Sequence, residues 1–79
     1  MRARVFVTLK EGVLDPQGLA IQGALGALGF DGVGSVRQGK VFYIELDGEE
    51  DAENRIRDMC GKLLANNVIE DYRVELIDR

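Results

Sequence analysis

The feature that most constrains this chain is the repetition, within 79 residues, of strand-like segments separated by helix-like segments. Alternation of apolar with other side chains is typical of a strand that has one buried face. The segments with this pattern are residues 3–9, 40–46 and 72–77. Apolar side chains at helical spacing fill much of the sequence between them. So short a chain can bury only one small core, so we expect a single domain over residues 1–79.

Capping residues mark both helices. Asp15 is the expected N-cap of the first helix, with Pro16 at its first position, and Gly29 lies where a left-handed C-cap is expected. The second helix is predicted to start at residues 47–50, where Asp47 and Glu50 have capping-box spacing, and to end at Asn66-Asn67. Its predicted buried stripe consists of Ala52, Ile56, Met59, Cys60, Leu63 and Leu64.

Residues 33–38 and 40–46 flank Gly39, a pattern that predicts a hairpin of two short strands. The resulting order is β-α-β-β-α-β. With right-handed crossovers, this order most simply gives an α+β, ferredoxin-like fold. We therefore expect an antiparallel four-stranded sheet with two helices on one face.

The composition excludes several functions. The chain has no His, and its only thiol is Cys60, so it cannot form a Ser–His–Asp or Cys–His site or a His-ligated metal site. Cys60 lies on the predicted buried stripe and is expected to be an inert core thiol in a reducing, cytoplasmic setting. The net charge of −4 disfavours nucleic acid as a partner, and no apolar run is long enough to cross a membrane.

The open face of the expected sheet carries exposed apolar groups. Phe6, Val41 and Tyr43 would point away from the helices, near Arg4. Such a patch favours a homodimer through this face or through a strand edge, and the alternative is that side chains such as Arg4 simply cover the aromatic rings. An RNA-binding sheet is disfavoured, because the third strand lacks the signature of that family. A domain that binds a small ligand such as an amino acid, at the loop of residues 10–14, is the main rival.

Three stretches carry a resemblance to a known family. They are Val7-Thr8-Leu9-Lys10-Glu11-Gly12-Val13-Leu14-Asp15-Pro16-Gln17-Gly18, then Val36-Arg37-Gln38-Gly39-Lys40, and Cys60-Gly61-Lys62-Leu63-Leu64-Ala65-Asn66-Asn67-Val68-Ile69-Glu70-Asp71-Tyr72. Together they resemble the PurS family over essentially the whole chain. PurS is the small subunit of phosphoribosylformylglycinamidine (FGAM) synthase in de novo purine biosynthesis. The chain departs from the family at Asn67, where Pro is common, and at Gly23 and Gly26, which replace bulkier helix formers.

The resemblance implies a non-catalytic scaffold within an ATP-dependent C–N ligase. A PurQ-type glutaminase would release ammonia, and a large PurL-type synthetase would use ATP and magnesium to activate formylglycinamide ribonucleotide. The chain itself would bind no cofactor or metal and carry no catalytic residue. As a dimer or tetramer it would bridge the two enzymes, so that ammonia reaches the synthetase.

The polar and glycine residues of the three stretches are the expected contacts with those subunits. They are Lys10, Glu11, Gly12, Asp15, Gln17, Arg37, Gln38, Lys40, Asn66, Asn67, Glu70, Asp71 and Tyr72. The expected homo-oligomer face consists of Arg4, Phe6, Val41 and Tyr43.

Overall fold

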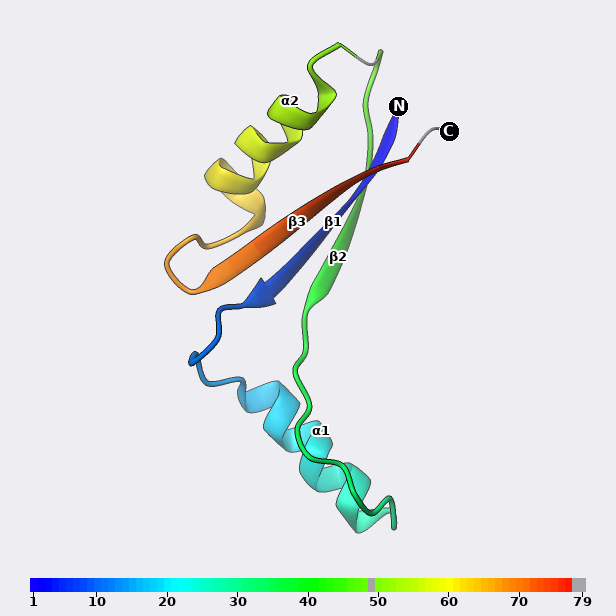
Figure 1. The fold of residues 1–79 in the computed structure, drawn as a ribbon, viewed down its shortest axis with the longest axis vertical. Helices are drawn as coiled ribbons and strands as arrows, with labels where there is room; N and C mark the ends of the chain where they lie inside the picture. The colour runs from blue at the N-terminus through cyan, green and yellow to red at the C-terminus, as the bar shows by residue number, and fades with distance from the viewer. Residues whose placement is uncertain (49, 78–79) are drawn as a thin grey trace.

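The structure is a computed structural model, and it describes residues 1–48 and 50–77. Over these residues the elements are β1 (Arg2–Leu9), α1 (Pro16–Ala27), β2 (Lys40–Glu45), α2 (Ala52–Met59), a π-helical turn η1 (Cys60–Leu64) and β3 (Glu70–Ile77). The three strands among these elements form one antiparallel sheet in the order β2-β1-β3 (Figure 1). The protein is therefore an α+β domain in which the predicted first and third strands are adjacent.

The alternation in β1 separates the two faces of the sheet as predicted. Ala3, Val5 and Val7 are buried in the core cluster, on the face that α2 covers (Figure 1). Val5 is paired with Phe42 on one side and with Val74 on the other, and both of these side chains pack against the same cluster. The register thus aligns the apolar rows of all three strands into one layer.

The predicted hairpin around Gly39 is wrong within one chain. Residues 33–38 form no strand and run as an extended connection from α1 to β2 (Figure 1). Gly39 does not make a turn but lies against β1, where a Cβ would come within 2.7 Å of the Val7 carbonyl oxygen. At Gly39 the chain therefore continues directly into β2 and does not reverse its direction, as it would in a hairpin.

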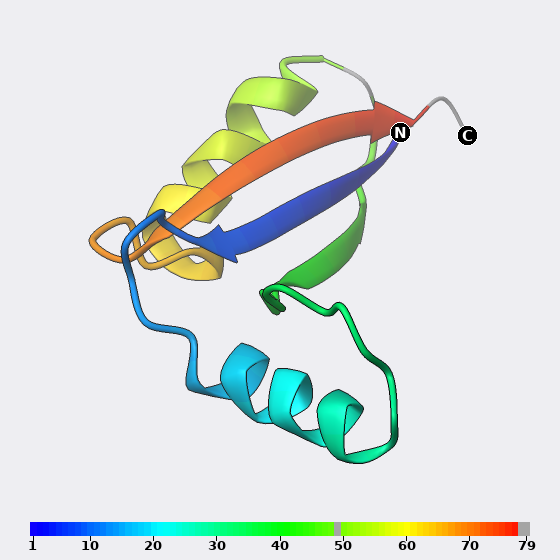
Figure 2. The same cartoon turned by 60° about the horizontal axis from the view of Figure 1, so that its bottom comes forward.

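The helix α1 has the predicted caps but not the predicted position. Gly29 has a φ of +93°, and the Phe30 N–H donates to the Leu25 carbonyl at 3.0 Å, as in a glycine-capped helix end. However, α1 projects from the end of the sheet instead of covering its face (Figures 1 and 2). The expectation of two helices on one face is therefore wrong for a single chain. We call residues 16–36, which comprise α1 and the segment that returns from it, the arm.

The helix α2 and the turn η1 cover the sheet with most of the predicted stripe. Ala52, Ile56 and Cys60 are buried, but Leu63 is 83% exposed. The cause is the π-helical turn, in which the Ala65 N–H donates to the Cys60 carbonyl at 3.0 Å. The wider turn changes the phase of the helix and rotates Leu63 away from the core.

The predicted start of the second helix is also wrong. The helix begins at Ala52, after Asp51 in a left-handed conformation with a φ of 57°. The Leu46 N–H donates to the Met1 carbonyl at 2.9 Å, so the pairing with the β1 side of the sheet extends one residue beyond β2. The chain therefore turns back toward α2 only after Leu46. Glu53 lies in the first turn of α2, and Glu49 is outside the described residues.

Candidate protein-interaction site

The three stretches that carry the family resemblance meet where the arm leaves the sheet. We call this region, formed by residues 10–18, 37–40 and 66–71, the junction. Asp15 lies at its centre and is 5% exposed. Its Oδ1 accepts the Gly18 N–H at 2.9 Å, which confirms the predicted N-cap, and its Oδ2 accepts the Gln38 N–H at 2.7 Å. The backbone N–H of Gln38, followed by that of Gly18, holds the pKa of the Asp15 carboxyl below its ordinary value of 3.8.

The guanidinium of Arg37 joins the two connections between sheet and arm. Its Nη1 donates to the Val13 carbonyl at 2.9 Å and its Nη2 to the Lys10 carbonyl at 3.2 Å. The side chains of Gln38 and Gln17 add a hydrogen bond of 2.6 Å beside these contacts. Arg37 and Asp15 thus bind the outgoing connection to the returning one and set the direction of the arm.

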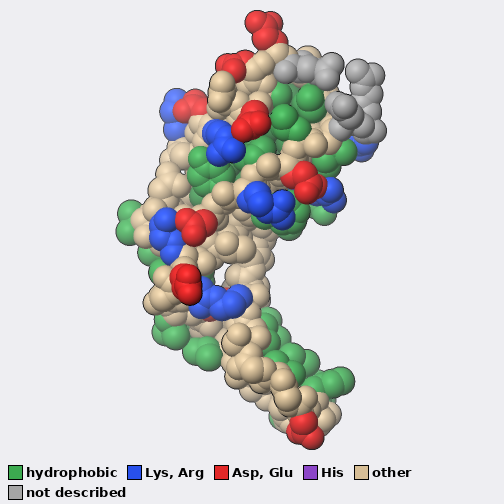
Figure 3. Space-filling model, viewed as in Figure 1, with side chains coloured by type: hydrophobic (Ala, Val, Ile, Leu, Met, Phe, Trp, Pro, Cys, Tyr) green, Lys and Arg blue, Asp and Glu red, His purple; other side chains and the backbone are tan. Residues whose placement is uncertain are grey.

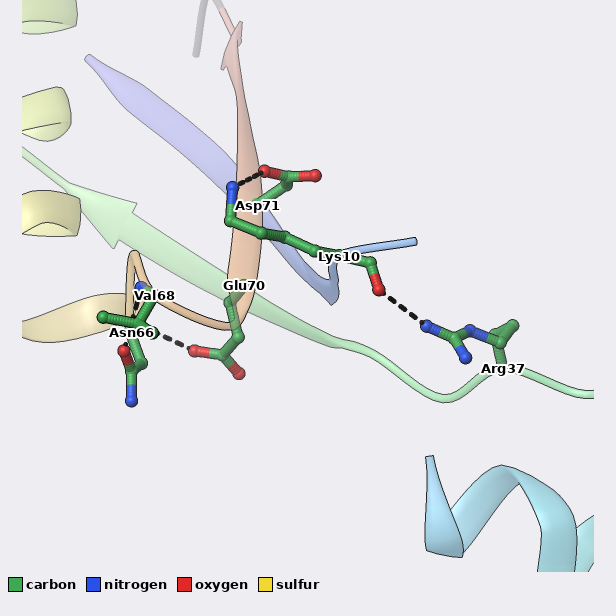
Figure 4. A network of polar contacts seen from close by, with 6 residues as sticks. All are labelled: Lys10, Arg37, Asn66, Val68, Glu70 and Asp71. Atoms are coloured by element: carbon green, nitrogen blue, oxygen red, sulfur yellow. Dashed lines mark hydrogen bonds and ion pairs between the residues drawn. The ribbon is translucent and has the colours of Figure 1, made fainter. Parts of the chain in front are cut away.

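A second group of contacts ties the junction to the start of β3 (Figure 4). The Lys10 Nζ lies 2.7 Å from the Asp71 Oδ1, and the Lys10 N–H donates to the Ile69 carbonyl at 2.8 Å. The Lys10–Asp71 pair is exposed, so we expect it to contribute no more than about 1 kcal/mol to stability. The pair places one positive and one negative group at the surface of the junction.

The corner before β3 is closed by Asn66 and Glu70. The Asn66 Oδ1 accepts the Val68 N–H at 3.1 Å, an Asx-type turn, and the Glu70 Oε1 accepts the Asn66 N–H at 2.7 Å (Figure 4). Lys40 reaches this corner from β2, with its Nζ 3.8 Å from the Glu70 Oε2. The corner is thus held by local bonds that leave Asn67 exposed.

The structure therefore gathers nearly all of the predicted contact residues into one region. Those that lie in the junction are Lys10, Glu11, Gly12, Asp15, Gln17, Arg37, Gln38, Lys40, Asn66, Asn67, Glu70 and Asp71. Tyr72 differs, because its side chain packs against the core on the face covered by α2. There Glu53, followed by Tyr72, raises the pKa of Arg57 above its usual value.

Sequence reasoning missed the role of Gly18 in the junction. A Cβ at Gly18 would lie 2.1 Å from the Val36 carbonyl oxygen and 2.9 Å from the Asp15 Oδ2. The absence of a side chain therefore lets the returning segment pass against the first turn of α1. A glycine three residues after an N-cap is a sequence signal for this contact, but the partner segment is visible only in three dimensions.

The predicted homo-oligomer face lies on the side of the sheet opposite α2. The Arg73 guanidinium stacks 4.2 Å from the centre of the Phe6 ring, and Arg4 forms an ion pair with Glu75. Tyr43, which is paired with Arg4 in the sheet register, is 76% exposed. Intramolecular side chains thus cover part of this face, although the covering residue over Phe6 is Arg73 and not Arg4.

Cys60 is fully buried, as predicted, and burial raises the pKa of its thiol. Within residues 1–48 and 50–77, no group of three or more Cys, Asp or Glu side chains lies close enough together to hold a metal ion. No helix in the same part of the chain has the length and apolar character to span a membrane.

Comparison with known proteins identifies one family and several relatives of this chain. The model of the family "PurS: Phosphoribosylformylglycinamidine (FGAM) synthase" matches residues 2–78. A PurS subunit from Bacillus subtilis (strain 168) is 46% identical over 76 residues, which are 95% of this chain and 90% of the relative. A PurS subunit from Archaeoglobus fulgidus is 49% identical over 76 residues, which are 94% of this chain and 95% of the relative.

Solved structures give the same result. The chain superimposes on a structure of B. subtilis PurS with a TM-score of 0.86, at 47% identity and with 94% of each chain covered. A chain in the structure of PurLQS from Thermotoga maritima gives a TM-score of 0.81 at 30% identity, with 94% of this chain and 93% of that chain covered.

The small sheet, the projecting arm and the polar junction define a small α+β domain of the kind that forms one subunit of a multi-subunit enzyme. The chain belongs to the PurS family, and so is a subunit of the ligase FGAM synthase. The resemblance seen in the sequence is confirmed.

Proposed function

We propose that this chain bridges a glutaminase and an ATP-dependent synthetase, so that ammonia released from glutamine reaches formylglycinamide ribonucleotide without crossing bulk solvent. ATP and magnesium are used by the synthetase, and this chain binds neither. The assembly works in the cytoplasm, where the unmodified Cys60 thiol is stable. The chain's contribution is the position in which it holds its two neighbours.

The observation that carries this proposal is the junction. Residues from three distant parts of the sequence meet there, and several polar side chains are exposed although their backbone is fixed by internal bonds. A surface whose backbone is already ordered loses little conformational freedom on binding, which favours a specific contact. The surface presents both signs of charge, including Lys10, Lys40 and Asp71, and so suits a partner with a complementary mixed pattern.

A relative supports the proposed identity of the partners. One related chain comes from a structure of PurLQS from T. maritima. By this likeness, the neighbours of the present chain are a large PurL-type synthetase and a PurQ-type glutaminase. Residues of the junction make the contacts with these subunits.

The chain also associates with itself, and the exposed Val41 and Tyr43 on the open sheet face are the self-association surface expected from the sequence.

The test is turnover of the synthetase with its cognate glutaminase, measured with and without this chain, with either glutamine or ammonium as the nitrogen donor. Adding the chain should raise glutamine-dependent turnover at least tenfold and ammonium-dependent turnover much less. Equal stimulation with both donors would mean that the chain activates the synthetase and does not couple the two enzymes. No stimulation with either donor would overturn the bridging role.

The rival function, binding of an amino acid, is tested separately on this chain alone. A regulatory site near residues 10–14 should raise the melting temperature when glutamine, glycine or another amino acid is added in millimolar amounts. A bridging subunit should show no such shift. The carbonyls of Lys10 and Val13 in this loop already accept the Arg37 guanidinium, which leaves them less able to bind a ligand.

A further inference from the structure

Arg37 differs from the other basic residues of the junction in its contacts. The Lys10 Nζ lies 2.7 Å from the Asp71 Oδ1. The Lys40 Nζ lies 3.8 Å from the Glu70 Oε2. Arg37 forms no ion pair within residues 1–48 and 50–77, and its guanidinium donates to backbone carbonyl oxygens instead (Figure 4). Its positive charge therefore lacks the carboxylate that each neighbouring lysine has.

The carbonyl contacts fix this guanidinium but leave some of its donors free. Its Nη1 donates to the Val13 carbonyl at 2.9 Å and its Nη2 to the Lys10 carbonyl at 3.2 Å. Its other N–H groups donate to no atom of the residues that the structure describes. Hydrogen bonds from a guanidinium to a carboxylate are shorter and stronger than those to a neutral carbonyl. Because the side chain is already held in place, it would lose little conformational freedom when a carboxylate binds.

A hollow in the surface lies beside this guanidinium, and we call it the Arg37 hollow. It has a volume of about 570 Å³ and is lined by Thr8, Leu9, Glu11, Gly12, Ser35 and Arg37. The hydroxyl groups of Thr8 and Ser35, both exposed residues, are further hydrogen-bond donors. A Cβ at Gly12 would meet nothing within 4 Å, so this wall of the hollow is open. The hollow thus combines a fixed cation with neutral donors, which is chemistry that binds a carboxylate.

The arm beyond the junction has few charges of its own. Residues 16–30 carry no charged side chain. On the face seen in Figure 3, charged groups gather over the sheet and the junction, whereas the arm is mainly apolar and neutral. A contact that is selected by charge is therefore expected at the junction, where Arg37 lies.

We propose that the Arg37 hollow receives the carboxylate of an aspartate or glutamate side chain on a partner subunit, which forms charge-assisted hydrogen bonds with the Arg37 guanidinium. This inference rests on the proposed function and assigns the chemistry of one contact within the junction. Arginine is enriched at protein interfaces, where pairing with a complementary charge gives specificity. Glu11 also lines the hollow and would repel an incoming carboxylate, which gives the test a sign.

The shape of the hollow favours a side chain of a protein over a free amino acid. Its lining residues other than Leu9 are exposed, so a small molecule bound there would stay largely in water. Sites for small molecules bury most of the surface of their ligand. A side chain that a partner carries into the hollow would instead be enclosed by the partner's own surface.

The main experiment places a competing carboxylate in the hollow. Ser35→Glu puts it two residues from Arg37 on the same face of an extended segment, where it can pair with the guanidinium within the chain. Binding to the synthetase and to the glutaminase is measured separately by surface plasmon resonance. The variant should bind one of these subunits at least about tenfold more weakly, and its melting temperature should not fall.

Ser35→Gln is the matched control, because it has the same size without the charge. It should bind within about threefold of the native chain. Equal weakening by both variants would show that bulk and not charge blocks the contact, and unchanged binding of Ser35→Glu would show that no partner carboxylate enters. Either result would overturn the inference. So would a changed sedimentation of Ser35→Glu alone, which would assign the hollow to a contact between copies of this chain.

Glu11→Gln reports the sign of the partner's charge. Removing this exposed acid should strengthen binding of the same subunit about twofold, the effect of a like charge roughly 8–10 Å away in water. Weaker binding would show that the incoming group is basic and would overturn the inference. Millimolar glutamate should leave the melting temperature of this chain alone unchanged. A rise that Ser35→Glu abolishes would make the hollow a site for a free amino acid, which also contradicts the inference.

The same measurements separate this inference from the proposed function. If the unmodified chain binds neither subunit, the bridging role fails and this inference fails with it. If the unmodified chain binds and Ser35→Glu binds equally well, the bridging role stands and only the assignment of the hollow fails.

Discussion

The carboxylate of Asp15 accepts the backbone N–H of Gln38 at 2.7 Å while it caps α1 through the N–H of Gly18 at 2.9 Å. One side chain therefore fixes both the start of the arm and its return to the sheet. The direction of the arm decides whether α1 covers its own sheet or remains available to a partner. Asp15 is thus a positioning residue for the assembly of the chain.

The first prediction concerns the pH dependence that Asp15 imparts. Its carboxyl has a lowered pKa in the folded chain, so its contribution to stability is complete above the ordinary value of 3.8 and is lost as the pH falls through the lowered pKa. Urea unfolding between about pH 7 and pH 2 should show a larger acid loss for the native chain than for Asp15→Asn. Parallel curves for the two proteins would contradict the role of the carboxylate.

The second prediction compares two glycines of α1. Gly18→Ala should destabilise the chain by about 1–3 kcal/mol, because its Cβ would overlap the Val36 carbonyl oxygen, 2.1 Å away. Gly23→Ala, where a Cβ meets nothing within 4 Å, should instead stabilise it by about 0.5–1 kcal/mol. The measurement is chemical denaturation of both variants at one protein concentration.

The outcome of that comparison is informative because Gly23 lies on the side of α1 away from Ile21 and Leu28, at 3.6 residues per turn. The Gly23 variant therefore leaves the exposed apolar side chains of α1 unchanged. If both variants were equally destabilised, the loss would reflect general sensitivity of α1 and not the close passage at Gly18.

The third prediction separates recognition from folding at the junction. Exchanging the partners of one ion pair, as Lys10→Glu with Asp71→Lys, retains an attractive pair but reverses the surface charges. Stability should change by no more than about 1 kcal/mol, since the pair is exposed. Binding to the cognate synthetase and glutaminase should weaken at least tenfold, as measured by surface plasmon resonance or co-sedimentation. Unchanged binding would remove these two residues from the proposed contact surface.

The fourth prediction concerns Cys60. Its thiol is fully buried and its pKa is raised by burial, so the native chain should react with a thiol reagent at least about a hundredfold more slowly than the urea-unfolded chain. Cys60→Ser should destabilise the fold by about 1–3 kcal/mol, because a hydroxyl would be buried in an apolar setting. Fast native labelling would show that η1 opens easily.

Much of the local structure follows from short-range chemistry and could be predicted. The alternation of β1 identifies its buried face, Asp15 with Pro16 starts α1, and Gly29 ends it. These features depend on neighbours within a few residues, and the structure confirms each of them. The junction residues could be singled out from family-like motifs, although the network that joins them could not.

What could not be predicted depends on contacts between distant segments. The π-helical turn that exposes Leu63, the passage of Gly39 along β1 and the outward arm are all settled by where the chain is held by other elements. The pattern in residues 33–38 indicates a strand, but it does not say whether another segment lies close enough to pair with it.

The sequence by itself determined most of the elements, the buried face of β1 and the family. The tertiary structure decided that these elements do not close into one complete domain. The physical reason is the tie between Asp15, Gly18 and Gln38, supported by Arg37. Its hydrogen bonds hold the two connections together and direct α1 away from the sheet that its apolar residues would otherwise cover.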